Sequence, residues 1–106
     1  MIKLSPKLLM ETYGKFICYC AACNDVHHFY TLKPNSLGLV WYFDKCLDEP
    51  SFYPDIKIYH ADGRICHSVI VSGNVIYSNK STHDFAGKTM ALPDFPKELL
   101  NTLMKE

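Results

Sequence analysis

The amino-acid sequence predicts an α+β fold, a β-rich single domain of antiparallel hairpins with a zinc knuckle and a C-terminal helix. Three observations lead to this prediction. Short runs rich in β-forming residues recur along the chain and are separated by turn residues, most clearly at 62–63 and 73–74. A Cys-x-x-Cys motif, Cys20 and Cys23, lies between two of these runs. The last residues of the chain space their apolar side chains as a helix does.

The composition agrees with one domain that spans residues 1–106. Hydrophobic residues make up 48% of the chain and charged residues 21%, which suffices for one modest core that a metal ion would reinforce. The 11 basic and 11 acidic side chains cancel, so binding to nucleic-acid phosphates is not favoured. No apolar run approaches the roughly 20 residues of a membrane span, and Pro6 and Lys7 interrupt the N-terminal apolar stretch. We therefore expect a cytoplasmic protein with reduced thiols and no membrane partner.

The first elements follow from caps and β-forming runs. Ser5 as an N-cap and Pro6 as the first helical residue predict a short helix that ends at Gly14. Residues 15–20 and 26–32 predict a hairpin with the two motif cysteines in its loop.

The middle and end of the chain predict more strands and one helix. Residues 38–44 predict a buried strand, and residues 81–87 predict one helical turn. A terminal helix is expected from Asp94 onward. Between these segments a three-stranded meander is expected at 55–60, 64–72 and 75–79.

The cysteine knuckle predicts a zinc site. Two thiolates three residues apart on a tight turn can bind one Zn²⁺, which needs further ligands from elsewhere in the chain. Side chains alternate along a strand, so Cys66 and His67 point in opposite directions, and Cys66 is the better third ligand. Ordinary buried thiols or a redox pair are the alternatives for the motif. The candidates for the remaining ligands are Cys18, His27, His28, Cys46, Cys66, His67 and His83.

A set of ordered motifs resembles a known family. They cover most of residues 16–96, and the family is a small phage and prophage zinc-binding domain of unknown function, often labelled "ammonia monooxygenase" without support from this chain. The motifs are Cys20-x-x-Cys23-x-x-x-His27, Trp41-Tyr-Phe43, Glu49-Pro50-Ser51-Phe52-x-Pro54, Arg64-x-Cys66-His67-Ser68, Gly73, Thr82-His83-x-x-Ala86-Gly87-Lys88-Thr89 and Leu92-Pro93-Asp94.

The resemblance implies a β-rich zinc-binding fold of viral or prophage origin. It implies zinc ligands at Cys20, Cys23 and Cys66, and a further cysteine where this chain has Ser81. Because serine is a poor zinc ligand, His83 is the first substitute as fourth ligand, and Cys46 or Cys18 are alternatives.

Three functions are consistent with these observations. The first, from the resemblance, is an accessory protein that binds a host protein in the bacterial cytoplasm, for example to inhibit a defence system as anti-CRISPR proteins do. The second is a zinc-dependent hydrolase that uses His67, His83 and Asp84 around a metal-bound water. The third is a zinc-ribbon nucleic-acid binder. The aromatic residues considered as exposed interface anchors are Tyr53, Tyr59, Tyr77 and Phe95.

Overall fold

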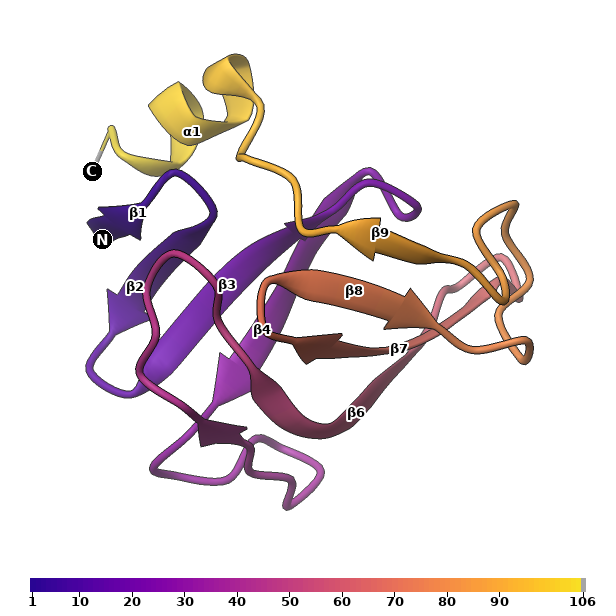
Figure 1. The fold of residues 1–106 in the computed structure, drawn as a ribbon. Coiled ribbons are helices and arrows are strands. Elements are labelled where there is room, and N and C mark those ends of the chain that lie inside the picture. The colour runs from indigo at the N-terminus through magenta and orange to yellow at the C-terminus, as the bar shows by residue number, and fades with distance from the viewer. Residues whose placement is uncertain (106) are drawn as a thin grey trace.

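Two antiparallel sheets and one short helix make up the computed structural model, which describes residues 1–105 (Figure 1). Within these residues the predicted β-rich α+β class is confirmed. Sheet 1 contains β1 (Ile2–Ser5), β2 (Leu8–Thr12), β3 (Lys15–Cys20) and β4 (Asp25–Tyr30) in that order. Sheet 2 contains β5 (Tyr42–Phe43), β6 (Phe52–Tyr59), β7 (Ile65–Val71), β8 (Asn74–Tyr77) and β9 (Thr89–Ala91), and α1 (Lys97–Leu103) follows.

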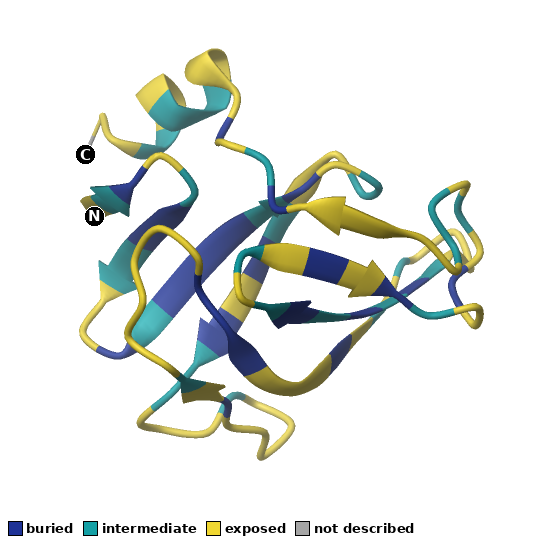
Figure 2. Cartoon of the chain, in the orientation of Figure 1, coloured by how far each residue is buried: buried dark blue, intermediate teal, exposed yellow. Residues whose placement is uncertain are grey.

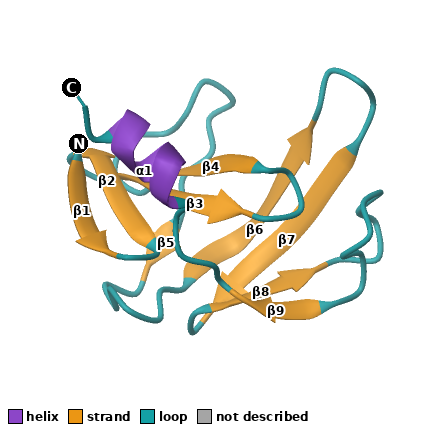
Figure 3. Ribbon diagram, turned by 90° about the horizontal axis from the view of Figure 1, so that it is seen from above, coloured by secondary structure: helices purple, strands orange, loops and turns teal. Residues whose placement is uncertain are grey.

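The inner faces of the two sheets share one apolar core. Phe29 of sheet 1 stacks on Phe52 of sheet 2 with ring centroids 4.4 Å apart, and Phe52 also stacks on Phe43. Buried residues therefore alternate with exposed ones along the strands (Figure 2). The outer face of sheet 1 is covered by α1, where Leu99 and Leu100 pack against a cluster that contains Leu9 (Figure 3).

The predicted N-terminal helix is wrong, because residues 2–12 form the β1–β2 hairpin. The Ser5 hydroxyl accepts a hydrogen bond from the Lys7 amide at 3.2 Å and so stabilises the hairpin turn instead of capping a helix. Leu8 and Leu9 are both 0% exposed and belong to different apolar clusters. Adjacent residues reach opposite faces only in a strand, so the two clusters favour β structure here.

Two loop segments also differ from the prediction. Of the strand expected at 38–44, only β5 is formed, because the Asn35 carboxamide oxygen accepts hydrogen bonds from the Leu37 and Leu39 amides and holds this stretch as a loop. The segment 81–87 forms successive turns instead of a helical turn. No residue pattern indicated β9, which pairs with β8 through Val75 and Met90.

The knuckle hairpin, the meander and the C-terminal helix are confirmed. The meander aligns Ile58 with Cys66 and Ile70 with Val75. Cys66 therefore lies near the start of β7, the central strand of sheet 2, and it is fully buried. The helix begins at Lys97. Among residues 1–105, no helix has the length and apolar character needed to span a membrane.

Candidate metal site

The knuckle is a tight turn that joins β3 to β4. Cys20 is the last residue of β3 and pairs with Asp25, the first residue of β4. Asn24 adopts a left-handed backbone conformation with φ of 52°, a region that asparagine tolerates better than most residues. The turn places Cys20 and Cys23 next to each other at the end of sheet 1, beside the inner face of sheet 2.

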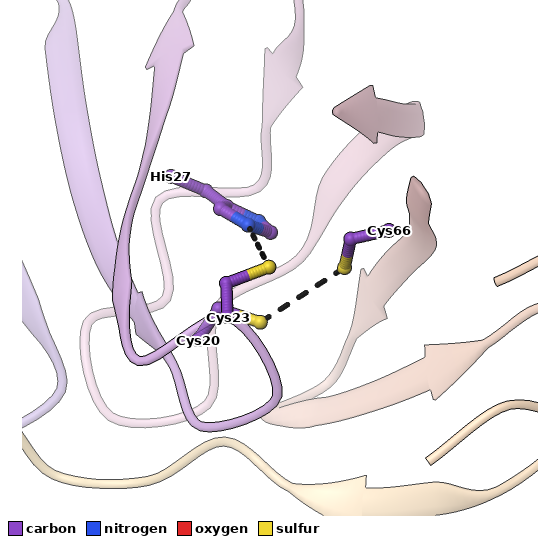
Figure 4. Close-up of side chains that lie close together, drawn as sticks. All are labelled: Cys20, Cys23, His27 and Cys66. Atoms are coloured by element: carbon purple, nitrogen blue, oxygen red, sulfur yellow. Dashed lines mark hydrogen bonds between the residues drawn. The ribbon is translucent and has the colours of Figure 1, made fainter. Parts of the chain in front are cut away.

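Three thiols and one imidazole meet at this end of the core (Figure 4). Cys20 and Cys23 come from the knuckle, His27 from β4 and Cys66 from β7, and one donor atom of each lies within 4.8 Å of all the others. His27 Nε2 is 3.4 Å from Cys23 Sγ. His27 points inward because it alternates with the exposed His28 along β4, and it is 6% exposed.

The spacing and the chemistry of these donors suit a metal ion. A tetrahedral site with metal–sulfur bonds of about 2.3 Å separates its sulfurs by about 3.8 Å. The Sγ atoms of Cys20 and Cys66 lie 4.0 Å apart. The cysteines are free thiols, so no disulfide competes for the sulfurs. This Cys3His cluster can therefore hold a metal ion.

The electrostatics of the cluster favour a cation. Hydrogen bonds donated by the thiols of Cys23 and Cys66 lower the pKa of Cys20 below its ordinary value, which favours a thiolate at this position. The same bonding to Cys20 raises the pKa of Cys23 to about 12 and raises that of Cys66. A metal ion would replace the shared protons and release them to solvent.

Each sulfur has one further polar neighbour outside the cluster of four. The Tyr77 hydroxyl lies 3.3 Å from Cys20 Sγ, His60 Nε2 lies 3.3 Å from Cys23 Sγ, and His83 Nε2 lies 3.4 Å from Cys66 Sγ. Such groups orient the thiolates and compensate part of their charge. Burial raises the pKa of Tyr77, so its hydroxyl stays protonated and can donate to the Cys20 sulfur.

The structure brings the three expected cysteines together and adds His27, one of several residues considered for the remaining ligand. His83, the expected fourth ligand, contacts Cys66 but is not among the four donors that all lie within 4.8 Å of one another. Its role as a ligand stays a prediction. Ser81, at the position of the missing cysteine, bonds the His67 backbone through its hydroxyl.

The other expected ligands lie apart from the cluster of four donors. Cys18 is buried in the apolar core, where burial raises its pKa, and Cys46 is exposed in the loop after β5. His67 points away from Cys66 and bonds the Asp55 carboxylate, and Asp84 is exposed. The contact of His60 with Cys23 was missed, although His60 directly precedes the turn that lies across from the knuckle.

A second feature is an apolar hollow of about 770 Å³ at the other end of the sheets. Its side chains come from four segments, within residues 10–16, 31–32, 40–45 and 53–54, and among residues 1–105 Lys45 is the only charged residue that lines it. Tyr13 is 86% exposed and Tyr42 64%. The aromatic and aliphatic side chains around the hollow are Tyr13, Phe16, Leu32, Val40, Trp41, Tyr42, Phe43 and Tyr53.

Of the aromatic residues considered as interface anchors, Tyr53 and Tyr59 are exposed, as expected. The expectation for Tyr77 and Phe95 is wrong, because both are buried. Tyr77 contacts the sulfur cluster, and Phe95 fills the space between sheet 1 and α1.

Comparisons of the chain with protein-family models, curated proteins and solved structures give no match.

Proposed function

We propose that this chain is a zinc-stapled binding protein that acts by engaging a partner protein. The observation that carries this proposal is the contrast between its two sites. The polar site is a set of four donors of which three are buried and Cys23 is half-buried, whereas the accessible site is a hollow lined by aromatic side chains. Buried thiolate-rich sites hold structural ions, and exposed aromatic hollows bind other molecules.

Zn²⁺ is the metal that the donors favour. Three sulfurs and one imidazole in a tetrahedral arrangement are typical of structural zinc sites. The four donors fill the coordination sphere and leave no position for a substrate. This arrangement supports a structural ion more than a hydrolase, whose metal keeps one position for water. The pairing of His67 with Asp55, away from the sulfurs, supports the same conclusion.

The hollow supports a protein as the partner. Its volume lies in the range of ligand sites, and its rim leaves Tyr13, Leu32 and Tyr42 more than half exposed. A contiguous exposed apolar surface of this kind on a small domain marks an interaction site, and tyrosine is a preferred interface anchor. Apolar side chains of a partner would fill the hollow.

The resemblance to the phage and prophage family suggests which partner to seek. It favours a bacterial host protein, including a component of a defence system whose activity the binding would inhibit. The neutral net charge of the chain supports a protein partner over a nucleic acid.

Capture from a bacterial lysate tests this proposal. The bait is the immobilised zinc-loaded protein, compared with the double variant Tyr42→Ser/Tyr53→Ser. Tyr59→Ser serves as a matched control, because Tyr59 is 70% exposed but does not line the hollow. We expect one host protein to be retained by the wild type and the control and lost by the double variant. Equal retention by all three baits, or no specific retention, would contradict the proposal.

A further inference from the structure

The two sheets leave two strand edges open on the same side of the molecule. β4 is the last strand of sheet 1 and pairs only with β3. β5 pairs with β6 only at Phe52 and Tyr53. Within residues 1–105, residues 55–59 of β6 therefore have a strand neighbour only on the β7 side. An uncovered strand edge presents unpaired backbone N–H and C=O groups.

The hydrogen bonds of β4 show which of its backbone groups face outward. The Thr31 amide donates to Gly14 O, toward β3, so the groups of Phe29 and His27 face β3 as well. The intervening residues face the other way. Accordingly Tyr30 O accepts a hydrogen bond from the Trp41 amide at 2.7 Å on the outer side. The N–H and C=O of His28 point in this same outward direction.

The same reasoning applies to β6. The His60 amide donates to Arg64 O, toward β7, so the backbone groups of Ile58 and Ile56 also face β7. Those of Lys57 and Tyr59 face outward. The carbonyl of Asp55 is on this outer side too, where it accepts a hydrogen bond from the Trp41 indole at 3.4 Å.

Both open edges line one groove of about 410 Å³, which we term the slot. It lies between residues 26–30 of β4 and 55–58 of β6, with Leu37 and Leu39 at its rim. Trp41 closes one end by donating one hydrogen bond to each edge. A group placed between these strands can thus bond both of them. In the rest of the slot, the backbone groups that point outward are those of His28 on β4 and Lys57 on β6.

We propose that the slot binds an extended segment of a partner protein, which enters as a strand between β4 and β6. From Val26 to Tyr30 the edge is about 13 Å long at roughly 3.3 Å per residue, enough for about four residues of the segment. Exposed Leu37 and Leu39 would cover apolar side chains on one face of the segment.

The charged residues at the slot indicate which side chain the bound segment carries. Among residues 1–105, Lys57 has no carboxylate within 4.0 Å, whereas Asp55 pairs with His67, and His28 with Glu11. The unpaired cation at the slot favours a segment that carries an aspartate or glutamate. This inference goes beyond the proposed function, since the slot is a different site from the aromatic hollow and needs only the two strand edges.

Selection of peptides tests the proposal. The zinc-loaded protein is screened against a displayed library of random heptapeptides with a central glutamate, and the best peptide is resynthesised for titration. Each of its backbone amides is then methylated in turn. A strand between two edges uses successive amides on alternate sides, so we expect methylation at each of four consecutive positions to weaken binding about tenfold. Weakening at every second position only would mean addition to a single edge and would overturn the proposal.

Variants of the protein locate the binding site. Lys57→Pro removes an outward N–H, a change that an edge strand tolerates, and we expect it to weaken the peptide about tenfold or more. Lys57→Glu keeps the N–H and reverses the charge, and should weaken the peptide as well. Lys80→Glu is the matched control at an exposed turn distant in sequence from the slot and should have no effect. Zinc content and melting temperature verify that each variant is folded.

Three outcomes would overturn the inference. The first is that no peptide is selected. The second is that binding of the selected peptide is unchanged by both Lys57 variants and is lost with Tyr42→Ser, which would place the peptide in the hollow. The third is that the protein alone forms a dimer and Lys57→Pro makes it monomeric, which would make a second copy of the chain the occupant of the slot. If the double variant Tyr42→Ser/Tyr53→Ser lost the partner from the lysate but still bound the selected peptide as the wild type does, the hollow and the slot would be two independent sites.

Discussion

The Sγ atoms of Cys20 and Cys66 lie 4.0 Å apart, although 46 residues separate the two cysteines in the chain. Cys20 ends a strand of sheet 1, and Cys66 is the second residue of β7, the central strand of sheet 2. A metal ion bound between them would join the two sheets directly, at the end of the core opposite the aromatic hollow. The stacked rings of Phe29 and Phe52 hold the same two layers together, and the ion would do so at a different point.

Cys66→Ser should remove the metal and destabilise the fold. We expect the zinc content to fall from about one per chain toward zero and the melting temperature to fall by at least about 10 °C, since each kcal/mol lost shifts it by roughly 4–8 °C in a domain of this size. Elemental analysis and thermal unfolding measure both. Cys46→Ser is the matched control, because Cys46 is exposed and lies apart from the cluster. Equal loss in both variants would contradict the site.

The three histidines near the sulfurs should differ in their effect on metal affinity. His27→Ala removes a ligand and should lower zinc affinity at least 100-fold, whereas His60→Ala and His83→Ala remove orienting groups and should lower it by about 10–100-fold. Competition with a chromogenic chelator ranks the variants. If His83→Ala had the largest effect and His27→Ala the smallest, His83 would be the fourth ligand, as the sequence alone suggested.

The Asp55–His67 pair should make stability depend on acid pH. The hydrogen bond with His67 lowers the pKa of Asp55 from its ordinary value of 3.8, so the pair stabilises the fold above that pH and the contribution is lost as pH falls through the lowered pKa. Asp55 is exposed, so solvent screening limits the effect to about 1 kcal/mol. Urea unfolding of Asp55→Asn should show a smaller stability at pH 6 than wild type, and the difference should shrink toward pH 2. A constant difference would exclude this origin.

The N-terminal hairpin makes a prediction that distinguishes it from a helix. Leu8 and Leu9 are both fully buried, in different clusters, so Leu8→Ala and Leu9→Ala should each destabilise the protein by about 2–5 kcal/mol. Urea unfolding measures the loss, and exposed Lys3→Ala serves as the control. If one of the two substitutions left the stability unchanged, the burial of Leu8 and Leu9 on opposite faces of the strand would be wrong.

The sequence predicted the elements that local chemistry determines. Alternating residues and the turns at 62–63 and 73–74 defined the meander, and the knuckle spacing defined the cluster around Cys20. The prediction of an N-terminal helix was wrong because Ser5 and Pro6 are residues that favour a helix cap and a tight turn equally. Only the long-range contacts of Leu8 and Leu9 decide between the two structures. The position of His27 in the cluster depended on the β3–β4 register, which spacing alone did not determine.

Two neighbours of the sulfurs could not be predicted for a similar reason. His60 and Tyr77 lie far from the knuckle in the chain, and the pairing of β6, β7 and β8 carries them to it. His83 was expected near the metal, and it lies beside the Cys66 sulfur. The hollow and the slot likewise depend on where β5 stops pairing with β6, at Tyr53, which no residue pattern specifies.

X-ray absorption at the zinc edge tests the central claim most directly. The protein is purified without chelator, and its metal content and coordination are measured together. We predict about one zinc per chain with three sulfur ligands at about 2.3 Å, one nitrogen at about 2.0–2.1 Å and no further light atom. Protein that carries no zinc, or a zinc with fewer than three sulfurs and a bound oxygen, would contradict a closed Cys3His site that joins the two sheets.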